Sequence, residues 1–368
     1  MDLLRIISML MVVTLHFYNH GGVLNTLTQG TANWYFGRLI YALSNVSVNC
    51  FVLLSGYFQC TSKFKLKRLV SVWIQALFYC VLLYGMDMAL KGEFSLMQFI
   101  KSGMVVTLKQ YWFVTAYLLM YAVSPFLNCA IRSMSKRMHL LCCCVLLGIF
   151  SVLHNLVYIS DFGHIVGGYS FLWFCVLYVT AAYLRLHVPV VSARRKYVLA
   201  YFVFAAAIAV EHIAACYITP LIFGKVMFER LFSSYNSIMT TAASISLLLA
   251  MRTVRIKSGR LTGVISFFAP LAFGVYLIHD HPAVRPLLWH WLPPNSTSGS
   301  VCMLPYMLIC VLSIFVVCCL IEWIRQLSFR VCRINRKVDQ LCDRVQAKIS
   351  DWLAVEKRNS TVEIQSER

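Results

Sequence analysis

The chain has 368 residues, of which 60% are hydrophobic and only 13% are charged, with a mean hydropathy of +0.72. Soluble domains are about 45–50% apolar and about 25% charged, so this composition excludes a soluble globule, a disordered chain and a secreted disulfide scaffold. The formal charge of +19 is typical of nucleic-acid binding, but 24 Phe, 19 Tyr and 8 Trp in apolar runs do not fit a soluble basic domain. The composition predicts an integral membrane protein with no nucleic-acid partner.

Apolar runs of bilayer length follow one another along most of the chain. A helix that crosses the hydrocarbon core needs about 20 residues, and the runs that meet this length cover about residues 3–20, 36–59, 69–90, 112–131, 138–159, 170–186, 197–219, 233–251, 262–284 and 301–325. The sequence therefore predicts an all-α fold, a polytopic bundle of about ten transmembrane helices that occupies residues 1–325.

The basic residues are distributed unevenly between alternate loops. With the N-terminus inside, 26 of the 33 Lys and Arg residues fall on the cytoplasmic side and seven fall outside. Because cytoplasmic loops carry the excess of Lys and Arg, both termini are expected in the cytoplasm. Most of the 15 cysteines lie inside the apolar runs without C-x-x-C spacing, as small hydrophobic residues do, so no metal site is expected.

The composition changes to mixed charge in residues 326–368. Val338, Leu341, Val345, Ile349 and Trp352 recur at spacings of three and four residues, which predicts an amphipathic helix with basic flanks. The favoured interpretation is a cytoplasmic tail helix on anionic membrane lipids. A helix that pairs with a partner or with its own copy is the alternative.

Arg5 and His16 form the most informative pair within the predicted spans. Their spacing of eleven residues corresponds to three helical turns plus about 20° and to a rise of about 16 Å, so both side chains lie on one face. Arginine suits phosphate at the membrane edge, and a neutral histidine suits general-base chemistry at depth. The aligned cation favours one ligand along this face over a histidine that only packs.

Six short motifs occur in one order along these helices, and they also carry a family resemblance. They are D-x-x-R-x10-H at the start, VNCFVLLSGYF (48–58), KFKLKRL (63–69), YWFVTAYLLMYAVSPFL (111–127), FSSYNSIMTTAASISLLLAMR (232–252) and AFGVYLIHDHP (272–282). This pattern resembles acyltransferase family 3, which consists of polytopic membrane proteins. The resemblance implies an enzyme that transfers an acyl group to a hydroxyl of a surface polysaccharide or lipid-linked sugar. The expected acyl group is acetyl and not a longer one, and the expected donor is cytoplasmic acetyl-CoA. The resemblance also implies a multi-pass protein of the bacterial inner membrane.

The resemblance assigns roles to residues by their positions. The essential arginine and histidine fall on Arg5 and His16, with His16 as general base or transient acyl carrier. The residues expected to hold acetyl-CoA are Arg5, Ser55, Gly56, Tyr57, Lys67 and Arg68. Trp112 and Tyr276 match family positions and are expected to contact the acceptor. Apart from the resemblance, Asn19, His20 and the loop 161–169 are expected to contact it as well, because these outer segments offer polar groups beside aromatic faces. His279 is expected to bind the acceptor or to act as a second acid or base.

Several alternatives stay open from the sequence alone. Glu211 is the deep carboxylate expected to orient His16, although a pair with His212 or a tyrosine of the bundle would also explain it. Gly56 either lets helices approach closely or leaves room for the donor. The alternative function is a secondary transporter or exporter of a glycan or small molecule, but no inverted repeat supports it. The sequence leaves the acceptor sugar and the oligomeric state open.

Overall fold

The computed structural model of the chain describes residues 1–106, 108, 110–156, 166–229 and 231–366. It is 79% helical, and the described ranges contain no strand, so the predicted all-α fold is confirmed. The longer helices are α1 (Asp2–Asn19), α3 (Ala32–Ser44), α4 (Ser47–Gln59), α5 (Leu66–Lys91), α7 (Trp112–Ser133), α8 (Lys136–Leu147), α10 (Phe171–His187), α11 (Arg194–Phe223), α12 (Ile238–Arg252), α13 (Gly259–Phe268), α16 (Met303–Val331) and α17 (Ile334–Ser366). The shorter ones are α2 (Val23–Thr26), α6 (Leu96–Gly103), α9 (His154–Leu156), α14 (Ala272–His279) and α15 (Val284–Trp291), with turns of other helix types at Gly148–Leu153, Val166–Gly168 and Pro294–Thr297.

Several helices begin at a serine or threonine residue whose side chain caps the first turn. A serine or threonine side chain accepts a hydrogen bond from the first turn of α3, α6, α8, α10, α12 and α13. Such caps satisfy backbone N–H groups that have no partner within the helix. The capping residues are Thr31, Ser95, Ser135, Ser170, Ser237 and Ser258. The apolar runs thus become helices with defined starts.

Among the described residues, seven helices are long and apolar enough to cross a membrane, or eight if α13 and α14, which meet at a bend of 40°, form one span. The expected spans at 170–186 and 233–251 are the apolar helices α10 and α12, of 17 and 15 residues. A helix of 15 residues is about 22 Å long, less than a hydrocarbon core of about 30 Å. The multi-pass membrane fold is therefore confirmed, whereas the count of ten and the cytoplasmic position of both termini stay predictions.

The outer surface of the bundle is apolar. Large side chains point away from the protein on several helices, including Phe126 at 75%, Leu199 at 65% and Leu221 at 86% exposed. In a soluble protein such a continuous apolar surface would drive association. It fits lipid acyl chains instead, in agreement with a multi-pass membrane protein.

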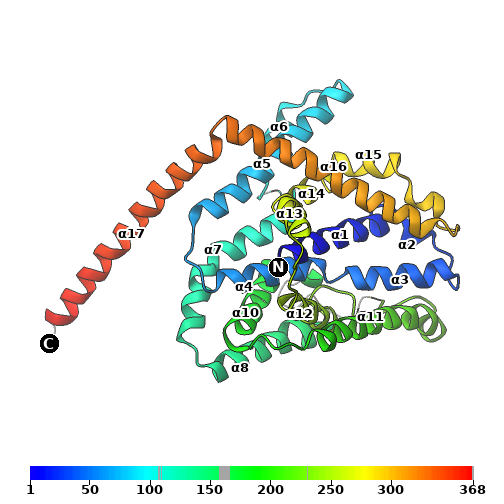
Figure 1. The fold of residues 1–368 in the computed structure, drawn as a ribbon, viewed down its shortest axis with the longest axis horizontal. Helices are drawn as coiled ribbons and strands as arrows, with labels where there is room; N and C mark the ends of the chain where they lie inside the picture. The colour runs from blue at the N-terminus through cyan, green and yellow to red at the C-terminus, as the bar shows by residue number, and fades with distance from the viewer. Residues whose placement is uncertain (107, 109, 157–165, 230, 367–368) are drawn as a thin grey trace.

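Helix α1 lies in the interior of the bundle (Figure 1) and packs against α3, α4, α14 and α16. One hydrophobic core is built mainly from α1, α5, α14 and α16, and a second from α4, α7, α10 and α12. The first core therefore holds α1 and α14 together, and the second presents α4 and α7 to them. Both cavities described below lie between these elements.

The C-terminal helix α17 extends away from the bundle (Figure 1). In its first half it contacts the start of α5, where Gln346 accepts from the backbone N–H of Leu66 at 3.0 Å and donates to the carbonyl of Phe64 at 3.2 Å. Leu341 and Ile349 on this helix are 63% and 49% exposed. The contact of this apolar face with lipid stays a prediction.

Candidate active site

Two cavities open between the helices around α1. The histidine cavity, of about 260 Å³, is lined by His16 and by residues of α4, α7 and α14. The arginine cavity, of about 830 Å³, is lined by Arg5 and by residues of α4, α5, α7 and α14. Since Arg5 and His16 both belong to α1, this one helix runs along both cavities.

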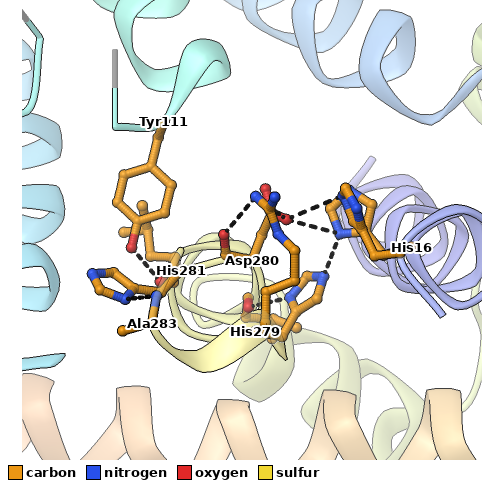
Figure 2. Close-up of polar contacts among 10 residues, drawn as sticks. His16, Tyr111, His279, Asp280, His281 and Ala283 are labelled. Atoms are coloured by element: carbon orange, nitrogen blue, oxygen red, sulfur yellow. Dashed lines mark hydrogen bonds and ion pairs between the residues drawn. The ribbon is translucent and has the colours of Figure 1, made fainter. Parts of the chain in front are cut away.

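His16 is held by two residues that follow each other at the end of α14. Its Nδ1 lies 2.9 Å from Nε2 of His279 and 3.5 Å from Oδ1 of Asp280. Figure 2 shows both side chains turned toward His16, although 263 positions separate the two histidines in the chain. The His16 side chain keeps 17% of its surface exposed, so part of the ring is open to the cavity.

These contacts fix which nitrogen of His16 carries the proton. Nδ1 of His279 lies 2.5 Å from the carbonyl oxygen of Val275, and a carbonyl can only accept, so His279 carries its proton on Nδ1. Its Nε2 is then an acceptor, and Nδ1 of His16 donates to it. The Nε2 atom of His16 is left unprotonated, as a general base requires. His279 thus holds the ring of His16 in place through this hydrogen bond, while its expected part in acceptor binding or as a second acid or base stays a prediction.

Asp280 also pairs with Arg285, at the same carboxylate oxygen that His16 approaches. The guanidinium Nη2 lies 2.9 Å from Oδ1 of Asp280 and donates to its backbone carbonyl at 3.0 Å. His20, one turn after His16, lies 3.6 Å from the same carboxylate oxygen. His20 also lines the histidine cavity, where its ring can hydrogen-bond to a ligand.

Three aromatic side chains form a wall of the histidine cavity. The ring centroids of Trp112 and Tyr169 lie 4.4 Å apart. The Trp112 ring also stacks on the Tyr235 ring, with 6.1 Å between the centroids and 18° between the planes. Gly168 allows this approach, because its φ is +95° and a Cβ there would lie 2.6 Å from the Cβ of Tyr235. Flat aromatic faces of this kind can pack against the apolar face of a ligand ring.

The predicted acceptor residues gather around this wall. Asn19, His20, Trp112 and Tyr276 all line the histidine cavity. The buried hydroxyl of Tyr276 has no hydrogen-bond partner among the residues that the structure describes. In the predicted acceptor loop 161–169, Tyr169 also lines the cavity, whereas residues 161–165 lie outside the described residues.

The arginine cavity brings together three of the residues predicted to hold the donor. Arg5, Ser55 and Arg68 line it. Arg5 is 43% exposed and pairs with Asp2 at 2.6 Å, a surface contact that contributes only about 0–1 kcal/mol and exchanges readily for an anionic ligand. The Ser55 hydroxyl donates to the carbonyl of Phe51 at 3.0 Å within its own helix.

Other predicted donor residues lie elsewhere. Gly56 packs against α10, because a Cβ would lie 2.8 Å from Cα of Tyr178, which supports close helix packing and not space for the donor. Tyr57 points to the other side of α4, where its hydroxyl accepts from Arg185 at 3.1 Å. Lys67 pairs with Asp339 of α17 at 3.7 Å and does not line the arginine cavity. A direct donor contact is therefore not supported for Gly56, Tyr57 or Lys67.

The expectation that Glu211 orients His16 is corrected by the structure. Glu211 lines neither cavity, and its neighbour His212 lies 3.8 Å from Glu229 in a separate cluster. The carboxylate beside His16 is Asp280. Depth within a predicted span identified Glu211 as unusual, but depth alone does not say which way the side chain faces.

Asp280 and Arg285 are the functional candidates that sequence reasoning did not assign. Asp280 follows His279 directly, so a carboxylate next to a candidate histidine at the end of a span was an available signal. His281, in contrast, lies on the far side of this turn (Figure 2), where its Nδ1 accepts from the backbone N–H of Ala283 at 3.1 Å. The sequence does not indicate Arg285 as a site residue, because its guanidinium meets Asp280 only through the folded turn after α14.

Side chains that commonly bind metal ions also occur in this site. Donor atoms of His16, His20 and Asp280 lie within 4.8 Å of one another. Arg285, however, already contacts the Asp280 carboxylate at 2.9 Å, and a bound cation beside this guanidinium would be disfavoured. The expectation of no metal at this site stays a prediction.

The fold and site define a multi-pass membrane protein with a part-buried histidine site that lines the smaller of two cavities along α1. The sequence profile of acyltransferase family 3, described as an acyltransferase domain, matches residues 1–323. The chain therefore belongs to this family and is a membrane acyltransferase. Comparison with curated proteins and with solved structures found no match. The family match favours an acyltransferase over the secondary transporter that was the alternative.

Proposed function

We propose that this acyltransferase moves an acetyl group from acetyl-CoA to a hydroxyl of a surface polysaccharide or lipid-linked sugar, with His16 as general base. The observation that carries this proposal is the chain of contacts from Val275 through His279 to His16. It leaves an unprotonated Nε2 on His16. A base of this kind is what the attack of a hydroxyl on a thioester needs.

The donor binds from the arginine cavity. Arg5 and Arg68 hold the phosphates of the nucleotide by charge-assisted hydrogen bonds. The pantetheine arm then runs along α1 toward His16, over a rise of about 16 Å. In this proposal the arginine cavity opens to the cytoplasm, where acetyl-CoA is available, and the protein lies in the bacterial inner membrane.

The transfer itself takes place in the histidine cavity. Nε2 of His16 takes the proton of the acceptor hydroxyl as that oxygen forms a bond to the thioester carbon. The bond between this carbon and sulfur breaks, and the CoA thiolate leaves and takes up the proton. Asp280 stabilises the positive charge that His16 carries in between, as a carboxylate next to a catalytic imidazole does.

The acceptor binds on the aromatic wall. The ring of a sugar packs on Trp112 and Tyr235, and its hydroxyl groups meet Asn19, His20 and Tyr276. The cavity of about 260 Å³ has room for one such ring at the end of a chain. No metal takes part in this proposal.

Mass analysis of the surface glycans tests the proposal. Cells that produce the full chain are expected to show one sugar with a gain of an acetyl mass, whereas cells that produce His16→Ala are expected to lack it. His290→Ala serves as the matched control, because His290 is exposed on α15 and lines neither cavity. An acetyl gain that persists in His16→Ala would overturn the role of His16, and no gain with the unaltered chain would overturn the reaction.

A further inference from the structure

Three phenylalanine rings lie where the two cavities meet. Phe51 of α4, Phe113 of α7 and Phe273 of α14 each line both the arginine cavity and the histidine cavity. All three are half-buried and pack against the core that contains α1. Because they come from three different helices, any ligand that extends from one cavity into the other passes between them.

Neighbouring aromatic rings hold these side chains in place. The centroid of Phe113 lies 6.3 Å from that of Phe51 and 5.9 Å from that of Tyr276, and both pairs meet edge to face. Phe273 lies 6.3 Å from the same tyrosine. Tyr276 thus supports two of the three rings, and a wider opening would require these contacts to break.

We infer that Phe51, Phe113 and Phe273 select the acyl group of the donor by its width. This inference rests on the proposed function, in which the nucleotide stays at Arg5 and the acyl end leads into the histidine cavity. The acyl group must then pass the three rings before its carbonyl reaches His16. An unbranched acyl group is as narrow as the cysteamine and β-alanine part of the pantetheine arm that follows it through the rings, whereas a branch at the carbon next to the carbonyl is wider. The dimethyl carbon of pantetheine lies farther from the thioester and stays on the side of the arginine cavity.

The volumes of the two cavities agree with this order of events. The arginine cavity is about 830 Å³ and places no tight limit on the donor. The histidine cavity is about 260 Å³ and must also accept the sugar. Selection at the junction therefore excludes bulky acyl groups before they compete with the acceptor for the smaller space.

Transfer from two radiolabelled donors, acetyl-CoA and isobutyryl-CoA, tests the inference. Permeabilised membranes that contain the full chain and its natural glycan supply the acceptor, and the label in the glycan is measured. Phe113→Leu, Phe51→Leu and Phe273→Leu are expected to raise the rate of isobutyryl relative to acetyl transfer by about tenfold, the discrimination typical of a small change in a hydrophobic pocket. Phe51→Trp is expected to lower acetyl transfer instead.

Phe58→Leu is the matched control, because Phe58 lines only the arginine cavity. Its ratio of isobutyryl to acetyl transfer is expected to equal that of the unaltered chain. An unchanged ratio in phenylalanine variants that still transfer acetyl, or an equal rise in Phe58→Leu, would overturn the inference alone. No transfer of either label by the unaltered chain would overturn the proposed function itself, so the two failures are distinguishable.

Discussion

The arginine cavity and the histidine cavity share one helix and three aromatic rings, yet they differ in size and in how firmly their side chains are held. Arg5 in the larger cavity makes one exposed ion pair. His16 in the smaller cavity is fixed by His279 and Asp280, and Asp280 is itself fixed by Arg285. Under the proposed function, this difference separates donor binding, which tolerates adjustable side chains, from acyl transfer, which requires a preorganised base.

The largest effect is expected from the removal of the base. His16→Ala should reduce the rate of acetyl transfer by about 10²–10⁴-fold, the usual contribution of a general base. Binding of acetyl-CoA should change little, because the nucleotide contacts lie in the other cavity. Transfer of labelled acetyl and equilibrium binding of the donor measure the two quantities separately. Equal losses of transfer rate and of donor affinity would show that the two cavities do not separate donor binding from catalysis.

Loss of a positioning residue should have a smaller effect. His279→Ala removes the acceptor for Nδ1 of His16, and Asp280→Asn removes the negative charge beside it. Each is expected to lower kcat by about 10–100-fold, as changes in groups that orient a functional histidine do. The KM for acetyl-CoA should stay close to its original value. A rise in KM with unchanged kcat would instead place these residues in donor binding.

Changes in the arginine cavity should show the opposite pattern. Arg5→Ala or Arg68→Ala removes a charged donor of hydrogen bonds, each worth about 1.5–3 kcal/mol, so the Kd for acetyl-CoA should rise about tenfold or more. The rate at saturating donor should fall much less. Arg194→Ala is the control, because Arg194 is exposed and lines neither cavity. An unchanged Kd in both variants would count against phosphate binding here.

The smallest effect is expected at Ser55. Its hydroxyl already bonds the carbonyl of Phe51 within α4, as serine commonly does inside a helix. Ser55→Ala should therefore change the Kd for acetyl-CoA less than about threefold, which is smaller than the loss of one neutral hydrogen bond of about 1 kcal/mol would cause. A rise in Kd as large as that of Arg5→Ala would show that Ser55 contacts the donor directly.

The features that could be predicted from the sequence are those contained in a single helix. Apolar runs identified the helices, and the spacing of Arg5 and His16 placed both on one face of α1, where each lines a cavity. Consecutive residues are less predictable, because they are separated by about 100° around a helix. Ser55, Gly56 and Tyr57 accordingly meet a cavity, a neighbouring helix and an arginine.

Contacts between distant segments could not be predicted in the same way. The pairing of His16 with His279 depends on how α1 and α14 pack, and no local pattern encodes it. Lys67 was expected at the donor from the family resemblance, but the tail helix supplies Asp339 as its partner. Glu211 was selected by its depth, while Asp280 at the end of a span lies beside His16.

The placement of Arg5 and His16 on one unbroken helix also restricts how the gene can change. Insertion or deletion of a single residue between them would rotate His16 by about 100° and shift it by about 1.5 Å relative to Arg5. The imidazole would then leave His279 and Asp280, whatever residue was inserted. Substitutions along this stretch can be accommodated one at a time, whereas a change in its length cannot.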